Sequence, residues 1–338
     1  FFDTVTMNTN HTHIQALRKI IYETLDPLIT QDYCLLDTPN YKNIGDNLIW
    51  AGELAFLKRL SFNMVYTANM YLCNFSKIPI ESTILLQGGG NFGDLWRTSQ
   101  EFRNKVVANC KNNKIIIFPQ TVFYNDKTLL KKDAQLFAQH PHLTICARDH
   151  ISYAILKQHF SHNNILLLPD MAFCLSLDKN LSEQETGKAL LMKRVDKELN
   201  TDIDIKNILS SNLNNTGRKV HIKDWPTYNL GKQTARIDAI SDTIQRKISE
   251  RMIGMPVAGK LVDYRYGLKR RDNLHRYIKM GIRFINEYDE IYTTRLHGYI
   301  LSILLNKKVH IIDNSYGKNS SFFNTWMKNF ENSFLITA

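Results

Sequence analysis

The chain has 338 residues, of which 43% are apolar and 22% are charged, the composition of an ordinary globular protein that is long enough for two domains. Its formal net charge is +11, and no apolar run reaches the ~18–20 residues that a membrane span needs. No basic and apolar leader opens the chain either, so we expect a cytoplasmic protein without a transmembrane helix.

The cysteines argue against a disulfide framework and against a zinc site. They are odd in number, widely scattered, and form no C-x-x-C pair. We therefore expect small, buried residues in a reducing compartment and no bound metal. The residues are Cys34, Cys73, Cys110, Cys146 and Cys174.

Positive charge is concentrated in residues 218–283, which hold 16 Lys or Arg against 6 Asp or Glu. Such a segment attracts anions, which include phosphorylated metabolites, nucleic acid and an acidic membrane surface. The alternative is a solvated helix face without any partner. The segment has no zinc-finger or RNP-type aromatic signature, so we expect no nucleic-acid partner.

The first half of the chain alternates short β-branched runs with stretches of helical period, which predicts a parallel sheet covered on both faces. We expect strands at residues 33–36, 64–67, 83–86, 114–118, 143–146 and 165–168. We expect helices at residues 47–60, 95–110, 129–139 and 151–160.

A polar stretch at residues 178–186 is typical of a linker, and the alternation starts again after it. Strands are expected at 187–194, 221–224, 290–294 and 309–312, and helices at 233–253, 268–287 and 297–305. The predicted fold class is therefore α/β, with two Rossmann-like, doubly wound domains (1–177 and 187–338) that face a cleft, as in GT-B enzymes.

Ligands of such folds bind just past the carboxyl ends of the strands, and a glycine-rich segment follows the strand expected at 83–86. Gly88, Gly89 and Gly90 precede Asn91 and permit positive φ and close backbone approach. Their N–H groups suit a nest for a phosphate or a carboxylate, although the segment is neither a Walker loop nor a good dinucleotide fingerprint. The alternative is a simple tight turn between a strand and a helix.

Three further strand ends carry polar groups. Gln120 follows one strand, Arg148 follows the next, and Asp170 follows the third, where it can orient a neighbouring Arg or His. Asp149 is a plausible N-cap of the next helix, so Arg148 would stand at a positive helix end, which is costly unless an anion binds there. The alternative is an Arg148 that is paired with Asp149 or Asp170.

The strongest candidate element is Arg295-Leu296-His297-Gly298, between a strand and a helix. Arg295 offers a planar fork for a carboxylate or a phosphate. His297, near a helix N-terminus, suits a group that accepts and donates a proton. A lone His would more often be structural, but an Arg and a His two positions apart at a strand end favour function.

Two flanking segments complete the set. Asp46 lies at the start of the first long helix, where an N-cap role for Asp46 or Asn47 is as plausible as catalysis. Lys318 follows the final strand and can reach a phosphate. We find no Ser-His-Asp triad, metal-ligand cluster or D-x-D signature, so the expected chemistry is free of metal and cofactor.

Together these motifs resemble the polysaccharide pyruvyl transferase family. N-x-G-D, G-G-G-N-F-G-D, F-P-Q-T, A-R-D-x-x-S, P-D-x-A-F and T-x-R-L-H-G follow one another between Asn43 and about Trp326, and residues 199–267 carry no motif. The resemblance implies a GT-B-like fold and an enzyme that transfers the pyruvate skeleton of phosphoenolpyruvate to two hydroxyls of a sugar, as a ketal. It implies that Arg148 and Arg295, with Leu296, hold the donor and that His297 is the acid/base.

The acceptor is expected to be a sugar of a surface polysaccharide or exopolysaccharide, or a lipid-diphosphate-linked oligosaccharide. The basic segment makes the lipid-linked form attractive, because it favours an anionic carrier and contact with the inner face of the membrane. The competing interpretations are a GT-B glycosyltransferase that uses a nucleotide sugar and a non-catalytic scaffold that has kept the fold.

Overall fold

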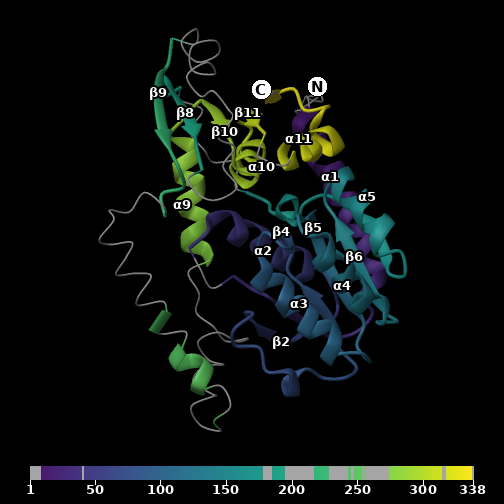
Figure 1. The fold of residues 1–338 in the computed structure, drawn as a ribbon. Helices are drawn as coiled ribbons and strands as arrows, with labels where there is room; N and C mark the ends of the chain where they lie inside the picture. The colour runs from purple at the N-terminus through teal and green to yellow at the C-terminus, as the bar shows by residue number, and fades with distance from the viewer. Residues whose placement is uncertain are drawn as a thin grey trace, which may run out of the picture.

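The computed structural model describes residues 9–39, 42–177, 185–194, 217–227, 243–244, 247–252, 255, 274–313 and 317–336. Two parallel sheets organise them (Figure 1). The N-terminal sheet has seven strands in the order β2-β1-β3-β5-β6-β7, and β4 pairs with β5. Its strands are β1 (Tyr33–Leu36), β2 (Met64–Ala68), β3 (Thr83–Leu86), β4 (Gly89–Gly93), β5 (Ile115–Phe123), β6 (Leu143–Ala147) and β7 (Asn164–Leu167).

Alternate residues of the N-terminal strands enter two different cores, which confirms a parallel sheet covered on both faces. Leu36, Leu86 and Ile117 belong to one core, while Leu35 and Leu85 belong to the other. The first core packs against α3 (Arg97–Asn109), α4 (Lys127–Ala138) and α5 (His150–His159). The second packs against α1 (Thr9–Leu25), α2 (Ile44–Leu57) and the 3-10 turn η3 (Met171–Cys174).

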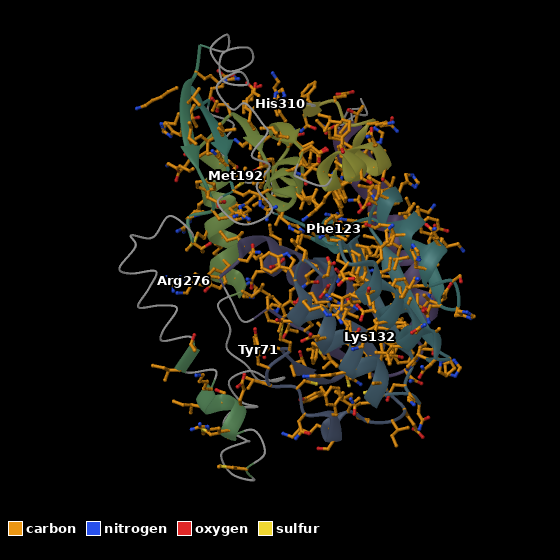
Figure 2. The ribbon with its side chains drawn as sticks, viewed as in Figure 1. Tyr71, Phe123, Lys132, Met192, Arg276 and His310 are labelled. Atoms are coloured by element: carbon orange, nitrogen blue, oxygen red, sulfur yellow. The ribbon has the colours of Figure 1, made fainter. Side chains whose placement is uncertain are left out.

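The C-terminal sheet has five strands in the order β12-β11-β10-β8-β9, all parallel. Its elements are β8 (Lys188–Met192), β9 (Lys219–Lys223), α9 (Leu274–Asn286), β10 (Glu290–Thr293), α10 (Leu296–Leu304), β11 (Lys308–Ile312), α11 (Lys318–Phe322), the π-helical turn η6 (Phe323–Met327) and β12 (Ser333–Ile336). Figure 2 marks Met192 and His310 on this sheet and Lys132 on the other half of the molecule.

One apolar cluster runs through both halves. It contains Leu48 of α2, Leu190 of β8 and Leu301 of α10, and α2 packs against both α9 and α10. The two sheets lie within the predicted ranges 1–177 and 187–338, but the division into two domains stays a prediction. Residues 178–184 of the expected linker lie outside the described residues.

Several elements were not predicted from the sequence, among them α1, β4, β12 and the short helix α11. Helix α1 buries Ile14, Leu17, Ile21 and Leu25 at helical spacing, a pattern that was readable but lay ahead of the first recognisable strand. Strand β12 is short and half-exposed. Strand β4 is described with the site. Of the helix expected at 233–253, the described residues 243–244 and 247–252 are helical, and the remainder lies outside the description.

No helix among the described residues combines the length and the apolar character that crossing a membrane requires.

Gly52 sets how closely α2 approaches η3. A Cβ at position 52 would lie 2.0 Å from the carbonyl oxygen of Met171 and 2.9 Å from the Cα of Ala172, so the backbones themselves would have to separate. We expect Gly52→Ala to lower the free energy of unfolding by about 1–3 kcal/mol, measured by urea denaturation, despite its better helix propensity. Lys58→Ala, at the exposed end of the same helix, should change it by less than ~0.5 kcal/mol. A Gly52→Ala protein as stable as wild type would contradict this packing.

Candidate functional site

A cavity of about 440 Å³ opens at the carboxyl ends of strands from both sheets. In the N-terminal sheet β1 lies between β2 and β3, and in the C-terminal sheet β8 lies between β9 and β10. The strand order reverses at β1 and at β8, because the strands that follow each of them in the chain lie on its two sides, and doubly wound folds bind their ligands at such points. Eight of the expected site residues line the cavity, namely Asp46, Gly90, Asn91, Arg148, Arg295, Leu296, His297 and Lys318.

Arg148 stands between the end of β6 and the start of α5, and it is completely buried. Asp149 caps α5 as expected, accepting the N–H of Ser152 at 2.9 Å. The guanidinium donates from Nη1 to Asp170 at 2.7 Å and from Nε to Thr121 at 2.9 Å. Its partner is thus Asp170 and not Asp149. The Nη2 group nevertheless has no hydrogen-bond partner among the described residues.

Asp170 is buried behind the cavity and does not line it. Its Oδ2 accepts from Arg148 and lies 3.4 Å from Nε2 of His297, and its Oδ1 accepts the N–H of Ala172 at 2.9 Å. Burial alone would raise the pKa of Asp170, but His297, Arg148 and the Ala172 N–H together hold the pKa well below its usual range. Asp170 is therefore an ionised anchor that orients two cavity side chains, an Arg and a His.

His297 lies in the first turn of α10, whose N-cap is Arg295. Its Nε2 faces Asp170, and the opposite edge of the ring lies against the N-terminus of α2. A Cβ on Gly45 would lie 2.9 Å from Nδ1 of His297, so glycine makes this approach of the two helices feasible. The imidazole, with 12% of its side chain exposed, can exchange a proton with a ligand in the cavity.

Asp46 lies in the first turn of α2, and it is not the N-cap. The cap is Asn43, whose Oδ1 accepts the N–H of Gly45 at 2.9 Å and whose Nδ2 donates to Oδ2 of Asp46 at 2.7 Å. The suggestion that Asp46 or Asn47 caps this helix is thus wrong. The carboxylate of Asp46 is oriented by Asn43 toward the cavity, next to His297 and Gly45.

The glycine-rich segment is a strand, which corrects the expected nest. Residues Gly89–Gly93 form β4, which pairs with β5 beyond the end of β3. Consequently β5 extends to Phe123, and Gln120 lies inside it, fully buried, donating to the carbonyl of Gln87 at 2.7 Å. Neither Gly89 nor Gln120 lines the cavity.

Gly90 provides the space in which two cations converge. A Cβ there would lie 2.8 Å from Nζ of Lys318 and 3.0 Å from Nη2 of Arg148. Lys318 begins α11 and is 7% exposed. Two largely buried cations that meet beside one residue of the cavity wall favour a carboxylate or a phosphate in the cavity.

The guanidinium of Arg295 binds a carboxylate of the protein itself. Its Nε and Nη2 donate side-on to the two oxygens of Asp224, the second at 2.7 Å. Asp224, which follows β9, also accepts the N–H of Trp225 at 2.7 Å. The expected bidentate contact with a ligand carboxylate is therefore occupied by Asp224, and Arg295 faces the cavity as an already paired cation.

Several lining residues were not singled out from the sequence. Arg194 follows β8, so the strand-end rule, had it been applied to the second half, would have found it, and it would also have found Asp224, which follows β9 and pairs with Arg295 behind the lining. Asn43 was readable as a cap residue. The aromatic residues that line the cavity belong to no motif, so no sequence pattern pointed to them. They are Tyr71, Trp96 and Trp225.

The cavity is strongly cationic. Among its described lining residues, Arg97, Arg148, Arg194, Arg295 and Lys318 face a single carboxylate, Asp46. In the part of the chain that the structure describes, no group of three or more His, Cys, Asp or Glu is arranged to hold a metal ion. The arrangement suits a small polyanion beside a proton-transferring imidazole.

Comparison with known proteins identifies a family and several relatives of the chain. The model of a family described as "Polysaccharide pyruvyl transferase" matches residues 43–316. The protein EpsO of Bacillus subtilis, which is named as a pyruvyl transferase, is 33% identical over 334 residues and covers 98% of this chain and 96% of its own. Pyruvyl transferase 1 of Schizosaccharomyces pombe is 27% identical over 306 residues, which are 87% of this chain and 69% of that protein.

A solved structure has the same fold. The crystal structure of a functionally uncharacterized protein of Klebsiella pneumoniae superimposes with a TM-score of 0.61 at 19% identity, covering 95% of this chain and 99% of that one. It supports the α/β architecture, with no bearing on the activity.

The Arg295–Asp224 pair should be a structural requirement of the cavity. Asp224 is 3% exposed and Arg295 is 5% exposed, so Asp224→Asn leaves a buried guanidinium without its counter-charge. We expect a loss of about 3–5 kcal/mol in the free energy of unfolding, measured by urea denaturation.

The matched control is Asp26→Asn, because its pair with Arg59 has side chains 37% and 38% exposed. Such exposed pairs contribute about 0–1 kcal/mol. If both substitutions lowered the free energy of unfolding equally, the claim that Asp224 is a structural requirement of the cavity would be refuted.

Proposed function

The chain belongs to the polysaccharide pyruvyl transferase family, and from that premise we propose that this transferase takes phosphoenolpyruvate as its donor. The pyruvate skeleton is transferred to two hydroxyls of a sugar in a surface polysaccharide or exopolysaccharide, and phosphate is released. The observation that carries the proposal is that Nη2 of Arg148, which has no hydrogen-bond partner among the described residues, and Nζ of Lys318 both lie beside Gly90, within the cavity of His297.

The donor's two anionic groups divide among these cations. Arg148 and Lys318 bind one of these groups. The guanidinium of Arg295 and the N-terminus of α10 bind the other. Leu296, Gly90 and Asn91 form the cavity wall around the donor. Asp170 positions Arg148 and His297 and keeps both oriented. Gly89 and Gln120 contribute indirectly, because their pairing holds β4 against β5.

The reaction then proceeds by proton transfer and displacement. His297 in its protonated form delivers a proton to the methylene carbon of the donor, and the central carbon becomes oxocarbenium-like. A sugar hydroxyl attacks that carbon and returns its proton to His297. The bond to the phosphate oxygen breaks, and the second hydroxyl closes the ketal as its single proton passes through Asp46 to the departing phosphate. The sum is donor plus diol giving ketal plus phosphate.

We also propose a domain arrangement and a cellular location for the enzyme. The two sheets would be the facing Rossmann-like domains of a GT-B-type transferase that works in the cytoplasm. The comparisons do not favour the alternative of a glycosyltransferase that uses a nucleotide sugar.

His297→Gln should lower phosphate release from phosphoenolpyruvate, in the presence of a panel of glycans, by roughly 10²–10⁴-fold, because the proton donor is removed. The substitution retains the size of the ring, so binding of phosphoenolpyruvate, measured by calorimetry, should survive. His159→Gln, at the exposed end of α5, is the control and should behave as wild type. Phosphate release by His297→Gln at the wild-type rate would reject the role of His297.

We further propose a lipid-diphosphate-linked acceptor and contact with the inner face of the membrane, on the basis of α9. Arg276, Lys279 and Arg283 form one exposed stripe of this helix and make no ion pair with any described residue. They line a groove of about 570 Å³ with Met280 and Phe284. Figure 2 shows Arg276 on this helix, away from Lys132. A cationic stripe over an apolar floor suits an anionic lipid headgroup.

Replacing Arg276, Lys279 and Arg283 together by Gln should weaken binding to phosphatidylglycerol vesicles roughly hundredfold, since each basic residue contributes about 1 kcal/mol at an anionic surface. The control replaces Lys127, Lys131 and Lys132 of α4 by Gln, which changes the net charge equally on another exposed helix. Vesicle co-sedimentation measures both. Equal weakening by the two triple variants would mean that only net charge matters and would reject the α9 surface.

A further inference from the structure

The end of the cavity away from Arg148 is aromatic and apolar. Met70 and Tyr71 follow β2, and Leu95 and Trp96 follow β4, and all four line the cavity. We call these four residues the aromatic shelf. Trp96 is 37% exposed, among the more exposed of the large apolar side chains described, and Figure 2 shows Tyr71 beyond β2. The donor chemistry above uses none of them.

Tyr71 and Arg148 lie at opposite flanks of one sheet edge, and Trp96 follows β4, which pairs with β5 between them. Arg148 follows β6 and Tyr71 follows β2, and β1, β3 and β5 lie between these strands. Four strand spacings of ~4.8 Å place the two strand ends roughly 19 Å apart. The cavity therefore extends along the sheet edge, well beyond what a three-carbon donor at Arg148 and Lys318 occupies.

The charge of the shelf end is compensated. Arg97, the cation that lines the cavity next to Trp96, donates from both terminal nitrogens to Asp133, with Nη2 at 2.9 Å from Oδ1. Both of its terminal nitrogens thus have a carboxylate partner, whereas Nη2 of Arg148 has no hydrogen-bond partner among the described residues. The shelf end consequently suits a neutral ligand.

The shelf is also held in place. The side chain of Asn69 accepts the N–H groups of Tyr71 at 2.9 Å and Leu72 at 3.1 Å, which fixes the turn after β2. Asp94 accepts the N–H groups of Asn125 at 2.7 Å and Asp126 at 2.6 Å, which fixes the segment before Trp96. Preorganised aromatic rings lose little entropy when a ligand binds.

We propose that the aromatic shelf is the acceptor subsite and holds a neutral hexopyranose by stacking the C–H face of its ring on Trp96 and Tyr71. Aromatic side chains combine a large apolar face with polar edges, and a pyranose combines an apolar C–H face with peripheral hydroxyls. The sugar's hydroxyls then point along the cavity toward His297. This subsite rests on the proposed pyruvyl transfer for its role, although its binding of sugar does not.

The test measures sugar binding without turnover. Saturation-transfer NMR with the methyl glycosides of glucose, galactose and mannose should show transfer to the ring C–H protons of at least one of them. Trp96→Ala and Tyr71→Ala should each weaken that binding at least about tenfold, while Trp96→Phe retains it. Phe334→Ala removes an aromatic side chain of similar exposure, 39%, outside the cavity and should have no effect.

Kinetics give the second readout. With a glycan that supports phosphate release, Trp96→Ala should raise the acceptor KM at least about tenfold and leave the KM for phosphoenolpyruvate within twofold. Absence of any glycoside binding, or binding that is unchanged in Trp96→Ala, overturns the subsite. Trp96-dependent binding of uridine diphosphate in place of the glycosides also overturns it. Glycoside binding without phosphate release in any glycan supports the subsite and rejects the proposed function.

Discussion

The shared carboxylate of Asp170 is the interaction on which the site depends. It is fully buried, and it is approached by Arg148 from the N-terminal half and by His297 from the C-terminal half. Each buried charge is costly alone and is tolerated because its partners are in place. Two further contacts reinforce the junction: Trp326 donates to the carbonyl of Arg148 at 2.8 Å, and Ser321 donates to Asp149 at 3.0 Å. The guanidinium and the imidazole are thereby held at fixed positions in the cavity.

Around this junction the cavity is divided by chemistry. Arg148 and Lys318 meet beside Gly90, where Nη2 of Arg148 has no hydrogen-bond partner among the described residues, and aromatic rings line the cavity after β2 and β4. Arg295 and Arg97 also line the cavity, but Asp224 and Asp133 already occupy their forks. Counting arginines at strand ends therefore overstates the number available to a ligand. What matters is which guanidinium nitrogens the protein leaves without a partner.

Strand ends were predictable because a β-branched run followed by polar residues has a clear pattern, and β1 and β3 begin and end at the expected residues. The strand ends identified in this way brought Arg148, Arg295 and His297 into one cavity, and Asp46, identified at a helix start, lines the same cavity. Long-range pairing was not readable. Glycines disfavour strands locally, so β4 forms only because β5 offers it backbone partners. Likewise Arg295 and Asp224 are 71 residues apart in sequence, and nothing local reveals that pair.

The contribution of each half to the cavity has a consequence for recombination between related genes. The aromatic shelf, Gly90 and Arg148 come from the N-terminal half, and His297 and Lys318 come from the C-terminal half. An exchange of halves between two relatives would preserve function only if the incoming partner presented an imidazole to Asp170 and left room for it at Gly45. A crossover near the polar stretch at 178–184 thus transfers all four residues of the aromatic shelf together. Asp170 and His297 lie on opposite sides of that crossover in the sequence, so they must remain compatible with each other.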